Sequence, residues 1–427
     1  MKKIIVFSIM AAMFLALVSC NNGTTSQTTN KVVQLTGTVN IWTSTEDEAM
    51  LSEGAAEFNK LNPKVKINIK TMDTNSEASA LTSAIQNKSD LPDIITMDTY
   101  NCEHFIDKFQ NNLLDVSSIS GFKSDSFVKS SINNGYINNK YYAIPWYVSP
   151  TYVVYREDIL DSYGINTEDI KSWDDIIDLE GSKIKQTGKG IFPLSYFKSG
   201  NYYLDAYNEL AINYFDQNNK AALLNADSMK VYNTINNMYF NNVFYDESKD
   251  GNEINSFVKG DTLGLVCDLK TLKDIESKYE NLKGKLDVEK LPGFEPGGNR
   301  DVIGSGSNIL TLKGSSNNKA AIVFIKYLSM NSKYALTEFN NFGKLSAYNN
   351  LYKEQSYFST DGYYGNKSLG RIAIDEVNGA RDVAYPKNFE FIETSIANAI
   401  TDSALNKKSL SDSITGIQNN LNTTTNN

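Results

Sequence analysis

Apolar and polar residues follow two alternating periods from about residue 36 onward. Val39 and Ile41 alternate with polar neighbours, which predicts a short strand. The apolar positions from Met50 to Leu61 then recur at helical spacing. Ser44 or Thr45 is expected to cap that helix, since an acidic residue follows three positions later in a capping-box arrangement.

The same alternation repeats once more along the chain. "VKINIK" at 65–70 predicts a second strand, and the apolar spacing over 78–85 predicts a second helix. "LPDIITMD" at 91–98 then predicts a buried strand. The order strand–helix–strand–helix–strand predicts an α/β fold with a parallel sheet flanked by helices.

Further along, strands and helices are more mixed. Two extended runs, "YYAIPW" and "TYVVYR", are joined around Pro145 and Pro150, where helix is disfavoured. The region 172–279 is expected to be largely helical, apart from a short buried strand in "GDTLGLVCD". "SNNKAAIVFIKYLS" predicts a strongly patterned helix, and two helices are expected over 388–422. We find no internal repeat.

The first 35 residues have the pattern of a secretion signal and a tether. Lys2 and Lys3 precede an apolar run, Ile4–Val18, that is shorter than a membrane-spanning helix. "LVSC" then resembles a bacterial lipobox, which implies cleavage after residue 19 and lipidation of Cys20. The alternative is an ordinary signal peptide in which Cys20 is incidental. The stretch from Asn21 to about Val32 is polar and without apolar periodicity, so residues 20–35 are expected to form a flexible tether to the membrane.

The composition narrows the range of possible functions and partners further. The chain of 427 residues is long enough for about two domains after the leader, and no second apolar stretch could span a bilayer. A formal charge of −9 argues against nucleic acid as a partner, because its binders need a basic face. The 25 tyrosines suit surfaces that grip polar ligands, and also many cores. Cys102 and Cys267 show no paired spacing, so two buried thiols are expected rather than a disulfide.

A family resemblance follows from the order of five stretches rather than from any single motif. The chain resembles family 1 extracellular solute-binding proteins, the sugar-binding lipoproteins of bacterial ABC importers, which are related to the maltose-binding protein. The final segment, 380–421, also looks like the family's closing helices. The stretches are "VNIWTSTEDE", "LPDIITMDTYNCEHF", "YYAIPWYVSPTYVVYRED", "GDTLGLVCD" and "GSGSNILTLKGSSNNKAAIVFIKYLS".

The resemblance implies a fold, an activity and partners. The fold is the two-lobed, class II periplasmic-binding-protein fold, in which each lobe is a sheet flanked by helices and several segments form the hinge. Lobe one is expected at 36–147 plus 301–348, lobe two at 148–300 plus 349–420, and a frayed tail at 421–427. The implied function is to capture a carbohydrate, either an oligosaccharide or a sugar derivative, and to deliver it to an ABC permease by hinge closure. We therefore expect a lipid-anchored extracytoplasmic monomer, without catalysis or a cofactor.

Ligands of open α/β sheets sit beyond the carboxyl ends of strands, which points to two groups of residues. Trp42, Thr43 and Glu46 follow the first strand, where Trp42 is expected to stack on a sugar ring and Glu46 to accept hydroxyl hydrogen bonds. Asp98 and Tyr100 follow the third strand in the same way. The alternatives are a core role for Trp42, a helix-dipole role for Glu46 and a loop-capping role for Asp98.

The family fold adds candidates at the hinge and at the next strand end. Trp146 and Tyr147 are expected to face the cleft from the hinge crossing, and the alternative is packing within the hinge. Asp268 follows the strand in "GLVCD", where the family has a polar turn that lines the cleft.

A glycine-rich segment and the last loop complete the expected site. Gly304, Ser305 and Gly306 are expected to bring main-chain N–H groups close to the ligand, because glycine permits close approach. The same residues also suit a simple bend. Arg381 and Tyr385 are expected to close the pocket from lobe two.

The residues leave three other functions open. An enzyme is disfavoured because His104 is the single histidine, although a glycosidase needs only two carboxylates. A metal site is suggested by tyrosine pairs that begin at Tyr141, Tyr202 and Tyr363, which fit a ferric ion, and by His104 beside Cys102. The same fold binding a peptide, a polyamine or another solute is the remaining alternative.

Overall fold

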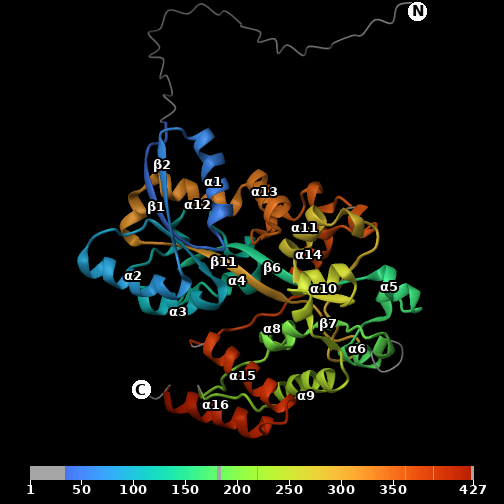
Figure 1. The fold of residues 1–427 in the computed structure, drawn as a ribbon. Helices are drawn as coiled ribbons and strands as arrows, with labels where there is room; N and C mark the ends of the chain where they lie inside the picture. Colours follow the sequence, from blue (N-terminus) through green and yellow to red (C-terminus); the bar gives the residue numbers. More distant parts are fainter. Residues whose placement is uncertain (1–33, 180–183, 219, 361, 388, 425–427) are drawn as a thin grey trace, which may run out of the picture. The chain divides into compact units, whose positions relative to one another are not determined.

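A computed structural model describes residues 34–179, 184–218, 220–360, 362–387 and 389–424 of the chain. The predicted signal peptide, Cys20 and most of the tether lie outside these residues. From Leu35 onward the described residues belong to one compact unit (Figure 1). No helix among the described residues is long and apolar enough to cross a membrane. Cys102 and Cys267 are free and buried, which confirms the expectation of two thiols.

The first five elements confirm the pattern of strands and helices. The strands β1 (Gly37–Ser44), β2 (Val65–Met72) and β3 (Ile94–Asp98) are parallel, with β1 between the other two. Helices α1 (Glu48–Leu61) and α2 (Thr74–Asn87) connect them. Two opposite faces of this sheet are covered, because Ile41 packs in one apolar cluster with α1 while its neighbour Trp42 packs in another with α2.

A long strand joins this sheet to a second group of strands. The strand β6 (Ala143–Tyr155) pairs through its first half with β11 (Ile303–Thr311) and with β12 (Leu345–Ser346). Its second half pairs with β9 (Gly264–Asp268) and β10 (Asp287–Lys290). Because β11 is antiparallel to both β3 and β6, the sheet is mixed rather than purely parallel.

The two prolines do not separate β6 into two strands. All positions of β6 are buried, and Pro145 and Pro150 lie within it. Proline cannot donate a ladder hydrogen bond, so a strand accommodates it at an irregularity. The register against β11 shifts at two places, between Ile303 and Ser305 and between Ser307 and Asn308, and the residues that pair with the prolines are Ile303 and Asn308.

Helices complete the apolar clusters around these strands (Figure 1). Helices α3 (Thr99–Phe109) and α12 (Lys319–Met330) pack on the β1–β3 side. Helices α11 (Leu269–Lys278), α13 (Ser332–Phe342) and α14 (Leu369–Gly379) pack around the second half of β6. The shorter elements are α4 (Lys129–Asn133), β4 (Tyr136–Ile137), β5 (Lys140–Tyr141), α5 (Glu157–Ser162), β7 (Phe192–Pro193), β8 (Phe244–Tyr245) and α10 (Glu253–Lys259).

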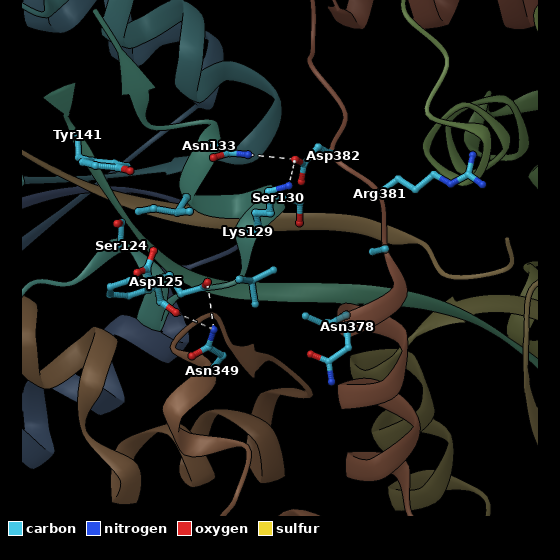
Figure 2. Close-up of a pocket in the computed structure, with 15 residues that line it drawn as sticks. Ser124, Asp125, Lys129, Ser130, Asn133, Tyr141, Asn349, Asn378, Arg381 and Asp382 are labelled. Carbon is cyan, nitrogen blue, oxygen red and sulfur yellow. Dashed lines mark hydrogen bonds and ion pairs between the residues drawn. The ribbon is translucent and has the colours of Figure 1, made fainter. Parts of the chain in front are cut away.

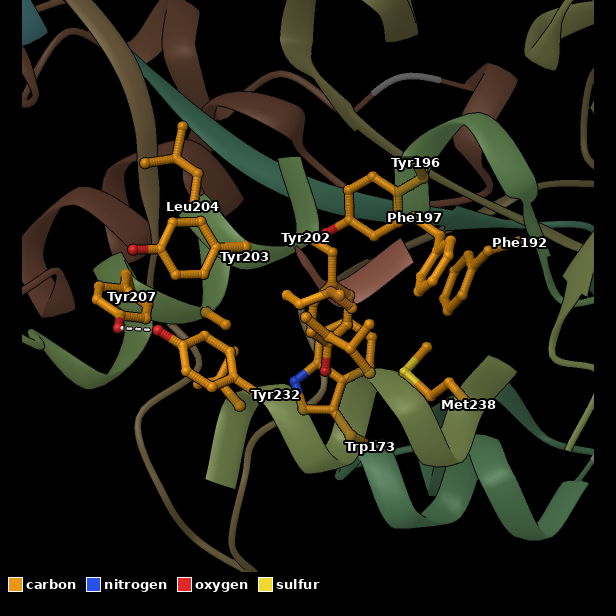
Figure 3. Packing of buried hydrophobic residues seen from close by; sticks show 14 of the residues in the cluster. Trp173, Phe192, Tyr196, Phe197, Tyr202, Tyr203, Leu204, Tyr207, Tyr232 and Met238 are labelled. Atoms are coloured by element: carbon orange, nitrogen blue, oxygen red, sulfur yellow. Dashed lines mark hydrogen bonds between the residues drawn. The ribbon is translucent and has the colours of Figure 1, made fainter. Parts of the chain in front are cut away.

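The mainly helical region forms a separate apolar cluster that is rich in aromatic rings (Figure 3). The rings of Tyr203 and Tyr207 lie 4.2 Å apart, and the Tyr207 and Tyr232 hydroxyls are hydrogen-bonded at 2.9 Å. The cluster draws on α6 (Trp173–Leu179), α7 (Leu194–Lys198), α8 (Asn201–Leu210), α9 (Ala226–Phe240), α15 (Phe389–Ala404) and α16 (Leu410–Thr424).

Two helical glycines provide a test of the packing between α1 and α13. A β-carbon on Gly54 would lie 2.7 Å from the Tyr334 ring, whereas one on Gly416 in α16 would meet nothing within 4 Å. Alanine favours a helix over glycine by up to about 1 kcal/mol, but overpacking a core costs about 1–3 kcal/mol. Gly54→Ala is therefore expected to lower the free energy of unfolding, and Gly416→Ala to leave it unchanged or raise it. Urea unfolding of both variants measures this, and an equal gain in both would contradict the packing described for Gly54.

Candidate functional site

Two adjoining cavities lie where the strands end. The first, which we call the β1–β3 cavity, has a volume of about 330 Å³. The second, which we call the β9 cavity, has a volume of about 220 Å³. Tyr100 and Ser305 line both cavities, so the two are neighbours. The carboxyl ends of β1, β2, β3 and β9 all contribute to the linings, as expected for ligand sites of α/β sheets.

One face of β6 supplies side chains to both cavities. Tyr147 lines the β1–β3 cavity, while Ser149 and Thr151 line the β9 cavity. Residues two apart along a strand share a face, so these three side chains point the same way. On β11, Ser305 and Ser307 follow the same rule. A period of two within the "YVSPT" and "SGS" stretches is the sequence signal for these positions.

Asp47 is held at the base of the β1–β3 cavity. Its Oδ1 accepts a hydrogen bond from the Tyr147 hydroxyl at 2.7 Å, and its Oδ2 accepts one from the Ser307 hydroxyl at 2.8 Å. Burial raises the pKa of Asp47, and these two hydrogen bonds partly oppose that rise. Asp47 occupies the N-cap position of α1 without a side-chain capping bond, which leaves its carboxyl group to Tyr147 and Ser307.

Two aspartates at strand ends cap the helices that follow. Asp98 accepts a hydrogen bond from the Asn101 main-chain N–H at 2.9 Å and begins α3. Asp268 accepts one from the Thr271 N–H at 2.9 Å and begins α11. Asp98 lines the β1–β3 cavity and Asp268 the β9 cavity, so capping and lining are done by the same side chains. Burial is the main reason that the pKa of Asp98 is raised.

Lys344 links the linings of the two cavities. Its ammonium group lies 3.1 Å from Glu46 and 3.6 Å from Asp268, and 5.0 Å from the centre of the Tyr147 ring. Its side chain is only 5% exposed. Sequence analysis missed Lys344 because its partners come from positions far away in the chain, and nothing in "FGKLS" indicates them.

Asp205 is the most unusual carboxyl group of the β9 cavity. It accepts hydrogen bonds from the Tyr196 hydroxyl at 2.9 Å and from the Thr151 hydroxyl at 3.3 Å. Burial nevertheless raises its pKa to about 7. Asp205 lies inside α8, which reads as an ordinary amphipathic helix, so its role was not visible in the sequence.

The structure brings together eight of the thirteen residues expected in the site. Two glycines among them permit close approach of chain segments, because a β-carbon on Gly306 would lie 2.8 Å from the Tyr147 carbonyl, and one on Gly304 would overlap the Thr151 hydroxyl. The eight expected residues that line the cavities are Glu46, Asp98, Tyr100, Tyr147, Asp268, Gly304, Ser305 and Gly306.

Three expected residues lie in the core instead. Trp42 is 4% exposed and has Lys70 Nζ 5.0 Å from its ring centre, and Thr43 is hydrogen-bonded to Thr96 at 2.7 Å. Trp146 is fully buried and its indole N–H donates to Glu338. The physical reason for Trp42 and Thr43 is that β1 runs on to Ser44 with both faces covered, so the first strand reaches the cavity only at Ser44. Trp146 is next to Tyr147 on β6, so its side chain points to the face of the strand opposite the cavity.

Arg381 and Tyr385 lie beside the two cavities rather than in them. The Tyr385 ring meets the Tyr100 ring edge-on at 4.8 Å, and its hydroxyl donates to Asn208 at 3.1 Å. Arg381 and Tyr385 both line a small cavity of about 20 Å³ that also includes Ser305. Tyr385 therefore contacts the site through Tyr100, whereas the Arg381 guanidinium is 3.5 Å from the Leu210 carbonyl.

A larger cavity, of about 690 Å³, lies elsewhere, among α4, the C-terminal end of α14 and residues 381–382 (Figure 2). Several of its polar side chains are already paired with one another. Asp382 accepts a hydrogen bond from Asn133 at 3.1 Å and lies 3.4 Å from Lys129. We assign the site to the smaller cavities because they lie at the strand ends.

No three His, Cys, Asp or Glu side chains of the described residues converge as a metal site. The buried phenols of Tyr363 and Tyr364 donate to main-chain carbonyls, at 2.6 Å to Tyr279 and 2.5 Å to Leu272. His104 lines an open groove on α3 with Glu103 and Asp107.

Residues 42–331 match the sequence profile of the bacterial extracellular solute-binding proteins. The arabinooligosaccharide-binding protein of Bacillus subtilis (strain 168) is 24% identical over 287 residues, a match that spans 66% of this chain and 66% of that relative.

Solved structures share the fold at low sequence identity. The sugar-binding protein MalE of Xanthomonas citri has a TM-score of 0.75 at 19% identity, over 90% of this chain and 96% of that one. An ABC substrate-binding protein of Listeria monocytogenes, solved in complex with cycloalternan, has a TM-score of 0.71 at 16% identity, over 92% of this chain and 99% of that one. The fold is therefore that of the two-lobed, MalE-like binding proteins.

The raised pKa of Asp205 predicts a pH-dependent stability. Unfolding returns the pKa of this carboxyl group from about 7 to its usual value of 3.8, so the native protein holds a proton that the unfolded chain has lost between these values. Relative to Asp205→Asn, the wild-type free energy of unfolding is expected to fall as pH rises from about 4 to about 7, by up to about 4 kcal/mol.

Urea unfolding at several pH values measures this difference. Glu280→Gln is the control, because the Glu280 side chain is 80% exposed and should give a curve parallel to the wild type. Parallel curves for wild type and Asp205→Asn would contradict the assignment.

Proposed function

The chain belongs to the bacterial extracellular solute-binding proteins, and from this premise we propose that it captures a carbohydrate for an ABC importer. The ligand is an oligosaccharide or a sugar derivative, held in the β1–β3 and β9 cavities and passed on to the permease subunits. The protein works as a monomer, without catalysis and without a cofactor. Its family relatives and fold neighbours are binding proteins, which supports this choice over a secreted carbohydrate-active enzyme.

The adjoining cavities are the single observation that carries this proposal. Their linings combine carboxyl groups with hydroxyl groups and with the rings of Tyr100, Tyr147 and Tyr196. Carboxylates accept strong hydrogen bonds from sugar hydroxyls, and aromatic faces pack on the apolar faces of sugar rings. Two neighbouring cavities of about 330 and 220 Å³ suit a ligand of more than one sugar unit.

Names of related proteins point in the same direction. The Bacillus relative is named for arabinooligosaccharides, and the Listeria neighbour is described with cycloalternan. We extend only the ligand class, oligosaccharide, to this chain. Peptide, polyamine and ferric ion remain the alternative solutes. Ferric ion is disfavoured by the tyrosine pair at 363–364, whose hydroxyls are used by main-chain carbonyls.

Closure of the two lobes would bury the ligand. We propose lobe one at 36–147 plus 301–348 and lobe two at 148–300 plus 349–420. By these bounds the strand β6 crosses between the lobes, and the segment before β11 and the segment after α13 are the further crossings. Helix α13 packs Tyr334 with the β1–β3 side and Phe339 with the β9 side, which supports a hinge role for this part of the chain.

The leader and Cys20 define the location that we propose. The extracellular family fits a lipid anchor on Cys20, with residues 20–35 as the tether on the extracytoplasmic side of the membrane. The lipid would place the binding site close to the permease.

Calorimetry with a panel of saccharides tests the function. The three tryptophans are 4%, 0% and 2% exposed, so titration calorimetry is preferable to tryptophan fluorescence. The panel should contain arabino-, malto- and galacto-oligosaccharides, neutral and with amino groups, and a peptide and ferric citrate as alternatives. Saturable binding of one saccharide is the expected result, and binding of only the peptide or iron would contradict the proposal.

Asp98→Asn tests the site itself. Asparagine also caps helices, so the variant keeps the start of α3 while it removes the charge. Loss of a charged hydrogen bond is expected to weaken saccharide binding about tenfold or more. Asp115→Asn is the matched control, since Asp115 caps a short helix outside both cavities. Equal affinity of Asp98→Asn and the wild type would remove Asp98 from the site.

Cys20→Ser tests the anchor. In a bacterial host the wild-type protein is expected in the membrane fraction, where it takes up labelled palmitate, and the variant is expected to carry no label. Cys102→Ser is the control, because Cys102 is a buried thiol and should leave labelling unchanged. A labelled Cys20→Ser protein would contradict the lipobox interpretation.

A further inference from the structure

The charged side chains that line the two cavities are all acidic. Among the described residues, no Lys or Arg side chain lines either cavity. Lys344 is not part of either lining, but its ammonium group lies 3.1 Å from Glu46 and 3.6 Å from Asp268. The carboxyl groups that line the cavities are Glu46, Asp47, Asp73, Asp98, Asp205, Glu253 and Asp268.

Another carboxyl group lies near the β1–β3 cavity. Glu77 on α2 is 1% exposed, and both of its carboxyl oxygens are buried without a hydrogen-bond partner. Glu77 lies one helical turn after Asp73, which lines the β1–β3 cavity. Burial, together with the charges of Asp98 and Asp47, raises the pKa of Glu77 to about 8. A buried polar group that lacks a partner is costly, and a ligand that supplies donors would remove that cost.

Three kinds of ligand group could bind in this acidic lining. A metal ion needs several oxygens at one point, and no such group occurs among the described residues. A neutral hydroxyl donates a hydrogen bond but leaves the repulsion between neighbouring carboxylates unchanged. A protonated amine donates up to three hydrogen bonds in different directions and also brings a positive charge. Carboxyl groups that are spread around a cavity therefore suit an amine best.

We propose that the β1–β3 cavity binds a protonated amine of the ligand at Asp98 and Asp47, with the buried carboxyl group of Glu77 one helical turn from Asp73, so that the substrate class is an amino-bearing saccharide. This inference rests on the proposed carbohydrate function. Saccharides that carry carboxylates, such as uronates, are rejected, because a like charge against these side chains is unfavourable.

Matched saccharides test the inference on the purified protein by titration calorimetry. Each set contains a neutral oligosaccharide, its 2-amino-2-deoxy form and its uronate, with the same linkage and length, and spermidine is included as an amine without a sugar. The amino form is expected to bind at least tenfold more tightly than the neutral form, and the uronate not at all. Raising NaCl from 20 to 500 mM should reduce the preference, because salt screens the charges.

Variants locate the amine. Glu77→Gln and Asp98→Asn are each expected to reduce the ratio of amino to neutral affinity by about tenfold. Glu280→Gln removes an exposed carboxylate and should leave that ratio unchanged. Two variants are used because a change at one buried position alone could alter the fold, which far-UV circular dichroism of each variant checks.

The outcomes separate this inference from the proposed function. Neutral forms that bind as tightly as amino forms, or any uronate that binds tightly, would overturn the amine site and leave the carbohydrate function in place. Binding of spermidine without any saccharide would overturn the carbohydrate function and support the amine site. Binding of none of these probes would overturn both.

Discussion

The strand β6 must satisfy its main-chain hydrogen bonds in two groups of strands at once, and the rest of the structure depends on this. Every position from Ala143 to Tyr155 is buried, and a buried main chain needs a partner for each polar group. The first half pairs with β11 and β12, and the second half with β9 and β10. Because the strand is continuous, Tyr147, Ser149 and Thr151 deliver one row of side chains to two cavities.

The two sides of the site share the same local arrangement of strand end and helix start. On each side a buried strand ends in an aspartate that caps the next helix, Asp98 before α3 and Asp268 before α11. An aspartate is favourable at this position whether or not a ligand is present, because it satisfies a free N–H group and complements the helix dipole. The second carboxyl oxygen accepts a hydrogen bond from a side chain, from Asn101 in the case of Asp98 and from Ser149 in the case of Asp268. Stability and ligand binding are thus compatible at Asp98 and Asp268, while the carboxyl groups of Glu77 and Asp205 gain no such capping role.

The many tyrosines have a different explanation from the one that composition suggested. Most of those in the helical region are buried together, and one hydrogen bond joins the Tyr207 and Tyr232 hydroxyls within the core (Figure 3). Only a few tyrosines, including Tyr100, Tyr147 and Tyr196, line the cavities. Aromatic content therefore says more about how this region packs than about what the protein binds.

The sequence by itself determined the elements and the strand ends. Apolar spacing predicted β1 to β3 with their helices, because each strand and helix buries its own periodic face. The rule that ligands sit beyond strand ends led to Glu46 and Asp98, and the family resemblance led to Asp268 at the next strand end, since all three positions depend only on local chain order. Only the tertiary structure decided which distant segments of the chain contact one another. It buried the side chains of Trp42 and Trp146 in the core, because both faces of the sheet are covered. It also brought Lys344 to Glu46 and Asp205 to Thr151, contacts between segments that no local pattern connects.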